Sequence, residues 1–486
     1  MCGAVLAGVL LSGCENATNK ATDVRLMNLL DNGLDAKAQE RLDARLSKAV
    51  ARGDKTNDLS GAHGDLQDTD IQELGTFLVA ALERNPRIGA AAQGINLADA
   101  RRLNAIFGYL PQVKLILDQN NVNQVVVETD NAVFQQGEAK YPVKTQQLRL
   151  EQPIFDLARI FGIQHASNAR SLVEVEYIRT VRDVAFEVFD AYVVAGQAKT
   201  QSQMLRRRMS LLSRQITSQS VLDASGLGDA IQKSSLASER ASLAAEEALN
   251  AAKYAEAMGS LARLTGVAVS DVPKLSLPRE IVGAERKVSA AQAVATGLQE
   301  NPLVMAAALT AVGADLERKT ALADDFSPVL MAYASIKKED RADSRFGGGS
   351  VTEDTTVGVA LTIPLFNATG EGYAMLPATV AARSAVLDYH AQRRELETSI
   401  RTTHARMGEL NKAMGQAGRA VSAARRALRS EEARSETGQS ADIAVAARKL
   451  RLEVARERAF FYQSEYLRAW GRLQYLVGAD LGNAPL

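Results

Sequence analysis

Several features that would assign the chain to a common class of protein are missing. Cysteine occurs only at Cys2 and Cys14 of the 486 residues, so the rest of the chain has no disulfide and no thiolate metal site. Lys plus Arg and Asp plus Glu number 57 each, a balance that favours neither nucleic-acid binding nor an acidic tail. Beyond Cys14 no apolar run approaches the ~18 residues of a transmembrane helix. Any crossing of a membrane would therefore have to use β-strands.

The residue patterns of enzymes are missing as well. The four histidines, His63, His165, His390 and His404, lie far apart and lack the spacing of metal ligands. The glycine run at 347–349 lies between two expected strands, so it does not predict a phosphate-binding loop. The sequence therefore predicts no catalytic residue, no metal site, no cofactor and no enzyme activity.

The N-terminus reads MCGAVLAGVLLSGC, a short apolar run with small residues before Cys14. Such a run is typical of a secretion signal and is too short to span a membrane. Its last four residues resemble the lipobox of bacterial lipoproteins, which implies cleavage before Cys14 and lipidation of its thiol. No Lys or Arg precedes the run, which departs from that pattern, and a plain cleaved signal is the alternative. We expect a signal peptide at 1–14 and a polar N-terminal extension at 15–70.

The body of the chain repeats one order of turn-forming residues. Five short motifs recur at offsets of 216, 217, 211, 212 and 212 residues. They are the pairs Asn85-Pro86 and Asn301-Pro302, Leu110-Pro111 and Ser327-Pro328, Pro153 and Pro364, Gly226 and Gly438, and Gly266 and Gly478. The nearly constant offset predicts two tandem repeats, at 71–266 and 291–480, joined by a Pro-bearing linker at 267–290.

Each repeat is predicted to contain a helix, two strands, a very long helix and a second helix. In repeat 1 we expect strands at about 111–130 and 141–153, the long helix at 156–222 and the second helix at 228–266. In repeat 2 the corresponding ranges are about 328–338, 355–364, 371–436 and 441–478. Each long helix would extend over ~100 Å.

Apolar residues recur in the long helices at steps of three and four, as a heptad seam requires. Examples are Ile178, Val181 and Ala185 in the first long helix, and Ile400 and Met407 in the second. Seams of this length predict long coiled coils, and an ordinary amphipathic bundle is the alternative.

The strand segments alternate between apolar and polar residues. Val357, Val359 and Leu361 share one face of the last strand, and Thr356 and Gly358 share the other. Alternating segments of about ten residues are typical of outer-membrane strands, and aromatic residues near the strand ends fit the membrane interface. Four strands cannot close a barrel, because known spanning barrels begin at about eight, but three chains would supply a 12-stranded barrel.

The chain resembles the TolC-type outer-membrane efflux protein family over about residues 71–480. The motifs that carry the resemblance are NPRIGAAAQ, FGYLPQV, LEQPIFD, SGLGDA and RLTG in the first half and NPLVMAAAL, DFSPVL, LTIPLF, TGQSADI and YLVG in the second. The resemblance implies a mainly α fold with a small β part and four transmembrane β-strands per chain. It also implies a homotrimer, in which one 12-stranded β-barrel continues into a coiled-coil α-helical barrel.

The same resemblance implies a passive exit duct in the outer membrane of a Gram-negative cell, with the helical barrel in the periplasm. The duct would belong to a tripartite efflux or type I secretion system. Its partners would be a periplasmic adaptor (a membrane fusion protein), an inner-membrane pump driven by protons or ATP, and outer-membrane lipid, with no nucleic acid. The exported substrate stays open, and a soluble periplasmic coiled-coil scaffold or adaptor without a pore is the alternative.

The resemblance also points to docking residues at the periplasmic tip, where this family receives the adaptor. They are Gly226, Leu227 and Gly228 in the first helix-helix turn and Gly438 and Gln439 in the second. The alternative is that the glycines only end their helices, because glycine permits the positive φ of a tight reversal.

A pore constriction is the second site that the resemblance implies. The family closes its periplasmic end with inward-facing aspartates after the second turn, and Asp442 matches one of them. Three copies would form a carboxylate ring that favours cations. Val445 stands where the family has another acidic residue, and an aspartate is also favourable at the start of any helix.

Overall fold

The structure is a computed structural model that describes residues 73–128, 137–224, 229–342, 349–365 and 373–479. The predicted signal peptide with Cys14, the N-terminal extension and the first tip turn with Gly226, Leu227 and Gly228 lie outside the described residues. The chain divides into two compact units. The described residues of the first lie within 96–172 and 308–388, and those of the second lie within 73–95, 173–307 and 389–479.

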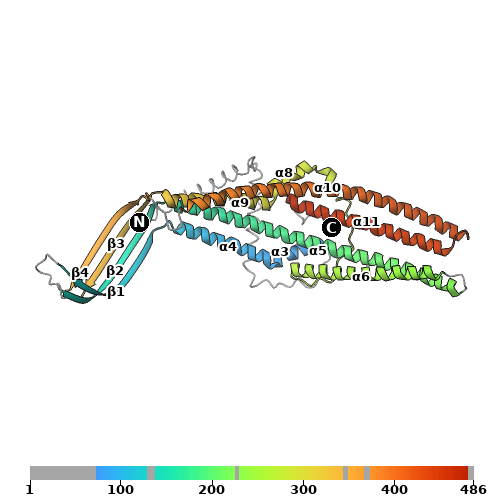
Figure 1. The fold of residues 1–486 in the computed structure, drawn as a ribbon, viewed down its shortest axis with the longest axis horizontal. Coiled ribbons are helices and arrows are strands. Elements are labelled where there is room, and N and C mark those ends of the chain that lie inside the picture. Colours follow the sequence, from blue (N-terminus) through green and yellow to red (C-terminus); the bar gives the residue numbers. More distant parts are fainter. Residues whose placement is uncertain (1–72, 129–136, 225–228, 343–348, 366–372, 480–486) are drawn as a thin grey trace. The chain divides into compact units, whose positions relative to one another are not determined.

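Long helices and one small sheet make up the described residues (Figure 1). The helices are α3 (Leu74–Arg84), α4 (Pro86–Phe107), α5 (Leu157–Ala224), α6 (Ala230–Thr265), α7 (Ala284–Lys287), α8 (Ala290–Glu300), α9 (Pro302–Phe326), α10 (Met375–Glu436) and α11 (Asp442–Val477). The strands are β1 (Gln112–Val126), β2 (Gly137–Phe155), β3 (Val329–Arg341) and β4 (Ser350–Thr362). A mainly α fold with a small β part is thus confirmed. None of the helices described has both the length and the hydropathy to cross a membrane.

The prediction of a single helix before each pair of strands is wrong. Each predicted helix is broken in two, at Asn85 between α3 and α4 and at Asn301 between α8 and α9. Both asparagines are extended, with ψ of 120° and 121°, because the proline that follows disfavours helical backbone in the residue before it. Their side-chain amides donate to the carbonyls of Leu264 at 2.9 Å and Leu476 at 2.8 Å. Each break therefore binds the end of a helix from its own repeat.

The first unit contains the sheet, which is antiparallel with the order β1-β2-β3-β4. The two long helices begin on buried carboxylates in this unit. Asp156 accepts the backbone N–H of Arg159 at 3.0 Å and its guanidinium at 2.8 Å. Asp325 accepts the backbone N–H of Met375, the first residue of α10, at 3.0 Å. These bonds satisfy N–H groups that have no partner within their own helix.

In the second unit, α5 pairs with α6 and α10 pairs with α11, each as an antiparallel hairpin (Figure 1). Ile400 and Met407 of α10 are fully buried, as the heptad pattern predicts. In α5 the predicted seam is confirmed only in part, because Val188 and Tyr192 are buried, whereas Ile178 is half-buried and its neighbour Tyr177 is buried instead. Since α5 contacts both α6 and α11, apolar residues on more than one of its faces are covered, and periodicity alone does not select the most buried one.

The linker between the repeats is held by two similar clusters of hydrogen bonds. Asp271 accepts from Lys199 of α5 at 2.5 Å and from Tyr254 of α6 at 2.8 Å. Burial raises the pKa of Asp271, but the two hydrogen bonds outweigh it, so the pKa lies below its ordinary value. The deprotonated carboxylate therefore stabilises the fold above about pH 4, and this stabilisation is lost as pH falls through the lowered pKa.

The second cluster is centred on Glu285, and its helix residues Asn411 and Tyr466 lie 212 positions after Lys199 and Tyr254. Glu285 accepts from Asn411 of α10 and Tyr466 of α11, both at 2.6 Å. The Tyr466 hydroxyl also accepts the backbone N–H of Gly283 at 3.0 Å. One linker is thus bound to both helical hairpins by side chains at equivalent positions.

Close packing of α5 against α11 depends on one glycine. A Cβ on Gly471 would lie 2.0 Å from a ring carbon of Phe189, which is fully buried. Gly259, at the equivalent position of α6, has no described atom within 4 Å of such a Cβ. The two repeats therefore differ in how tightly this position is packed.

We predict that Gly471→Ala lowers the free energy of unfolding by about 1–3 kcal/mol, because the new methyl group would force the buried Phe189 ring to shift. Gly259→Ala is the matched control and should be neutral or slightly stabilising, since alanine is the better helix former. Denaturant unfolding of both variants measures the difference. Equal effects of the two substitutions would contradict the packing described here.

Candidate functional site

One face of the sheet is apolar and exposed over neighbouring rows of residues, and the row that follows on the same face contains the ion pair Lys338–Glu353. In the register of the four strands, Val113, Leu150, Ala334 and Val357 form one row across this face. Leu115, Leu148 and Ile336 form the next row. Their exposed fractions include 62% for Val113, 66% for Leu115 and 78% for Val357. An uncovered apolar face of this kind marks a surface that binds another apolar phase or partner.

The opposite face of the same sheet is polar along the equivalent rows, whereas further along it Ala139 and Tyr141 form a small buried apolar cluster. Lys114, Arg149 and Ser335 lie in one row across β1, β2 and β3. Glu151 lies between the two cations, at 3.3 Å from Lys114 and 2.6 Å from Arg149. In the neighbouring row Tyr333 packs directly over Gly358, where a Cβ would lie 2.8 Å from the tyrosine hydroxyl. The sheet is therefore amphipathic, with ionic and hydrogen-bonding groups on one side only along these rows.

The outer strands of the sheet are β1 and β4. Each pairs with a neighbour on one side only in the described chain. The N–H and C=O groups that point away from the sheet along these two strands are consequently available to pair with another strand.

The second tip turn, between α10 and α11, is built on Gly438. This glycine has φ of +73°, a left-handed conformation that ends α10. Its N–H donates to the carbonyl of Ser435 at 3.0 Å, and the N–H of Gln439 donates to that of Arg434 at 2.8 Å. Together these bonds form a Schellman motif. Gly438 therefore ends the helix. The predicted docking residues Gly438 and Gln439 are both exposed in this turn and remain accessible.

A buried glutamate in α10 stabilises the same turn through hydrogen bonds. Glu431 accepts from the Ser440 hydroxyl at 2.5 Å and lies 3.4 Å from Arg448 of α11. The hydrogen bond from Ser440, together with the nearby arginines, holds the pKa of Glu431 below its ordinary value. No sequence pattern singles out this residue, because a glutamate in a helix rich in charged residues has the same sequence context whether it is buried or solvated.

Asp442, the predicted constriction residue, is the first residue of α11 and is exposed. One carboxylate oxygen accepts from the Ser435 hydroxyl at 3.2 Å. In the first hairpin, Asp229 plays a different part, since it caps α6 by accepting the N–H groups of Ile231 at 2.9 Å and Gln232 at 3.1 Å. The Asp442 carboxylate makes no such cap, because Ala441 holds the N-cap position of α11.

Charged side chains join the two hairpins part of the way along α5 and α11. Arg208 of α5 lies 2.8 Å from Glu457 of α11 and 3.6 Å from Glu239 of α6. The side chains of Arg208 and Glu457 are only 14% and 19% exposed. Within the described residues the Nε of Arg208 and one buried oxygen each of Gln215 and Glu453 have no hydrogen-bond partner. The contact between the hairpins is thus polar and incompletely satisfied, which makes it sensitive to the loss of any one group.

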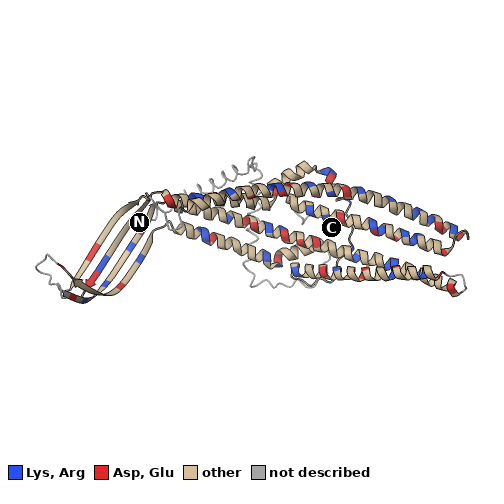
Figure 2. Ribbon diagram, in the orientation of Figure 1, with Lys and Arg blue, Asp and Glu red and all other residues tan. Residues whose placement is uncertain are grey.

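Charges of both signs are interspersed along α10 and α11 (Figure 2). No large block of one sign is visible on these helices, which agrees with the overall charge balance. In the part of the chain that the structure describes, no three His, Cys, Asp or Glu side chains are grouped so as to hold a metal ion.

Solved structures with the same fold are known. The outer membrane protein VceC of Vibrio cholerae has a TM-score of 0.68 and 18% identity, over 84% of this chain and 96% of that one. The Campylobacter jejuni CmeC outer membrane channel has a TM-score of 0.66 and 13% identity, over 83% of this chain and 85% of that one. The open state of the Neisseria gonorrhoeae MtrE outer membrane channel has a TM-score of 0.60 and 15% identity, over 86% of this chain and 94% of that one. No family model and no curated protein matches the chain.

The Arg208–Glu457 pair yields a prediction. Glu457→Gln should lower the free energy of unfolding by about 2–3 kcal/mol, because Arg208 would keep a largely buried charge without its closest counter-charge. Glu409→Gln is the control, since Glu409 and Lys412 are 73% and 70% exposed and such a pair contributes at most about 1 kcal/mol. Denaturant unfolding compares the two variants. A Glu457→Gln effect no larger than the control would show that the pair does not hold the hairpins together.

Proposed function

We propose, from the fold that this chain shares with the TolC-type outer-membrane channels, that it is a passive exit duct in the outer membrane of a Gram-negative cell. The observation that carries the proposal is the amphipathic sheet with its exposed apolar face. In water, such a face would normally be covered by other parts of the protein. In a bilayer, lipid tails would solvate it, and the polar face would line a water-filled interior.

The open edges of the sheet support a duct that is built from more than one chain. In lipid, each unpaired backbone N–H or C=O costs several kcal/mol. Pairing β4 of one copy with β1 of the next would satisfy both edges. Three copies would then form a barrel of about 12 strands, which exceeds the smallest spanning barrels of about eight strands. We therefore propose a homotrimer with four spanning strands from each chain.

The helical hairpins would form the periplasmic wall of the same duct. Long helices with buried apolar seams and exposed charges suit a tube that is filled and surrounded by water. The tip turns, with Gly438 and Gln439 in the second and Gly226, Leu227 and Gly228 in the first, would receive a periplasmic adaptor. An inner-membrane pump would supply the energy and choose the cargo, for efflux or type I secretion. Lipidation at Cys14 would add an anchor in the outer membrane.

Asp442 would form the narrowest charged part of the duct. Its carboxylate is exposed and accepts one hydrogen bond from Ser435, so it is available to a passing ion. Three copies around a threefold axis would give a ring of carboxylates that attracts cations and repels anions. Because the chain would consist of two tandem repeats joined by a linker, each helical hairpin would end in one tip turn.

Reconstitution of the purified full-length protein tests the function. We expect discrete conductance steps in a planar lipid bilayer, partition with outer membranes, and a heat-modifiable trimer on gels. A protein that washes off the membrane as a soluble species and gives no conductance would instead be a periplasmic scaffold.

The constriction can be tested in the same bilayers. Asp442→Asn should make the channel less cation-selective and shift its reversal potential in a KCl gradient towards zero, because three negative charges are removed from the ring. Asp229→Asn is the control, since asparagine also caps a helix and the fold should be kept. An unchanged reversal potential in Asp442→Asn would exclude Asp442 from the ion path.

The docking turns can be tested in cells that carry the adaptor and the pump. Leu227→Asp should impair export and leave the trimer inserted, because a charge replaces the apolar side chain that would enter a gap on the adaptor. Leu227→Met keeps an apolar side chain and should export normally. Full export by the Leu227→Asp variant would remove the first turn from the docking surface.

A further inference from the structure

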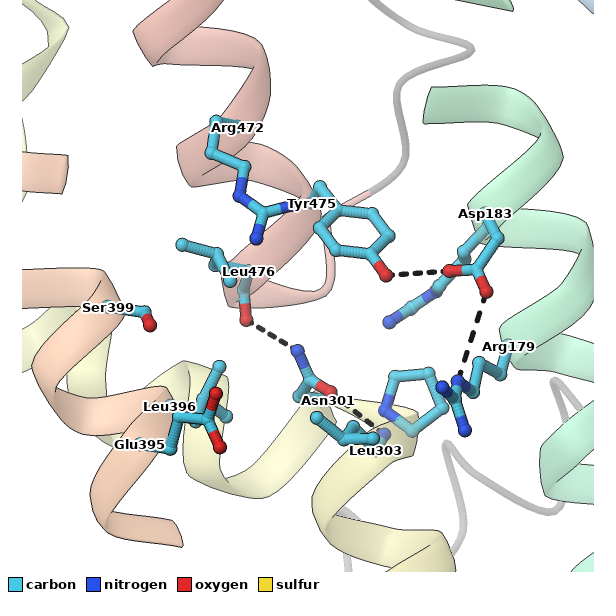
Figure 3. A pocket seen from close by; sticks show the side chains of 12 residues that line it. Arg179, Asp183, Asn301, Leu303, Glu395, Leu396, Ser399, Arg472, Tyr475 and Leu476 are labelled. Atoms are coloured by element: carbon cyan, nitrogen blue, oxygen red, sulfur yellow. Dashed lines mark hydrogen bonds and ion pairs between the residues drawn. The ribbon is translucent and has the colours of Figure 1, made fainter. Parts of the chain in front are cut away.

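One face of α11 packs against α5 within the second unit. Glu457 lies 2.8 Å from Arg208 of α5, and the Tyr475 hydroxyl donates to Asp183 of α5 at 2.6 Å (Figure 3). Between Glu457 and Tyr475, the residues at steps of three and four along α11 are buried, and they are Phe460, Ser464, Leu467 and Gly471. This row of residues, which we call the α11 face, holds the second hairpin against the first.

The equivalent row of α6 is uncovered. The residues that lie 212 positions before the α11 face are all exposed, and they are Ala245, Ala248, Ala252, Ala255, Gly259 and Arg263. The structure supports this offset, because Tyr254 and Tyr466, which are also 212 positions apart, both bind a carboxylate of the linker. We call these six residues the α6 face. It is a surface whose counterpart in the other hairpin is covered by a long helix.

The long helix equivalent to α5 is α10, and its corresponding surface is uncovered too. Residues of α5 that bind α11 lie 212 positions before Glu395, Thr402 and Ala420 of α10, and these three are exposed. We call them the α10 face. Both long helices are continuous through these positions, so the offset stays constant along them. Since α5 contacts α6 as well as α11, α6 and α10 are the outer helices of the two hairpins.

The first pair of equivalent positions keeps a donor opposite an acceptor. Tyr475 and Asp183 correspond to Arg263 of α6 and Glu395 of α10. Both Arg263 and Glu395 are exposed, and neither makes an ion pair with another described residue. A contact between the α6 face and the α10 face would therefore place a guanidinium opposite a carboxylate.

The second pair of positions loses both of its charges together. Arg208 and Glu457, the ion pair between α5 and α11, correspond to Ala420 of α10 and Ala245 of α6. Had only one of the two charges been replaced, a contact between these faces would bury the other without a partner, which is costly. Two alanines leave no such charge.

A third pair changes its chemistry and stays compatible. Arg468 of α11 lies 3.1 Å from Asp190 of α5. The corresponding residues are Glu256 of α6 and Thr402 of α10, a carboxylate that accepts hydrogen bonds and a hydroxyl that donates one. None of the three pairs would bring like charges together, so the α6 and α10 faces are complementary in charge.

We propose that α6 of one copy packs against α10 of the next copy through these two faces, with Arg263 paired to the partner's Glu395. This contact rests on the homotrimer proposed above and specifies how its helices meet. It joins two different surfaces, and such a head-to-tail contact closes into a ring when it is repeated around a threefold axis. The small residues of the α6 face would allow the two helices to approach closely.

Chemical cross-linking of the full-length protein in proteoliposomes tests the contact. A variant with Ala245→Cys and Ala420→Cys is treated with a short bis-maleimide, and we expect covalently linked trimers on denaturing gels. Each substitution alone shows any linkage through the cysteines already present. Unlinked monomers of the double variant would overturn the proposal.

The matched control combines Ala245→Cys with Ser422→Cys. Ser422 is exposed and lies two positions after Ala420, but Ser210 at the equivalent position of α5 is exposed as well, so α11 does not cover that side of the helix. We expect several-fold less linkage for this pair. Equal linkage in the control would contradict the assigned faces.

A charge exchange tests the Arg263 pair. Arg263→Glu should lower the temperature at which the trimer dissociates on gels by several degrees, because two carboxylates would face each other at every contact. Arg263→Glu combined with Glu395→Arg should restore that temperature. The control is Lys253→Glu, which changes an exposed lysine outside the α6 face; its equivalent, Glu465, pairs with Arg406 of α10.

Failure of this contact and failure of the proposed function are distinguishable. Conductance by the unmodified protein, without linkage of the Ala245→Cys and Ala420→Cys variant and without restoration by the charge exchange, would remove only the α6–α10 contact. A protein that neither conducts nor forms a trimer would remove the proposed duct and this contact with it.

Discussion

The constraint on which the rest depends is that a four-stranded amphipathic sheet with two open edges is incomplete by itself. The rows through Val113 and Leu115 present an apolar surface to solvent, and β1 and β4 each leave one side of their backbone unpaired. A barrel formed from several copies solves both problems together, because it pairs the edges and turns the apolar face towards lipid. If the sheet is completed in this way, the long helices, the tip turns and the proposed constriction become parts of one duct.

The two repeats share a plan but differ in chemistry. Side chains at equivalent positions bind the linker, as Tyr254 and Tyr466 show, yet Asp271 also accepts from the cation Lys199, whereas Glu285 accepts from the neutral Asn411. The pairs Gly259 and Gly471, and Glu187 and Ser399, diverge more strongly, since one member of each is packed or paired and the other is not. A duplicated helical framework leaves such positions free to change, because the helical seams continue to supply most of the stability.

The sequence predicts those features that depend on local rules. Alternation placed residues such as Val357 and Leu361 on one face of a strand, and the structure exposes both on the apolar face. The turn glycine Gly438 has the positive φ expected of a helix-ending residue. Periodicity also identified the long helices, although in α5 it selected Ile178 in place of the more buried Tyr177, because α5 packs against more than one neighbour.

Features that depend on distant parts of the chain were not predictable from the sequence. The pairing of β2 with β3, as in Leu148 with Ile336, joins the two repeats across a long stretch of chain, and no local pattern encodes it. Likewise, Glu431 and Arg208 look like ordinary charged residues until packing buries them. For the candidate sites, the roles of Asp442 and Gly438 stay predictions from the sequence, which did not show the hydrogen bonds that hold them.

Disulfide cross-linking between the outer strands is the most direct measurement of the central claim. One cysteine is placed in β1 by Val113→Cys and one in β4 by Val357→Cys, Val359→Cys or Leu361→Cys in turn, so that several registers are sampled within the ~4–7 Å that a disulfide allows between Cα atoms. The account predicts that oxidation in the membrane gives a closed, covalently linked trimer for at least one of these pairs. Monomers at every register, or an open-ended ladder of higher oligomers, would contradict it.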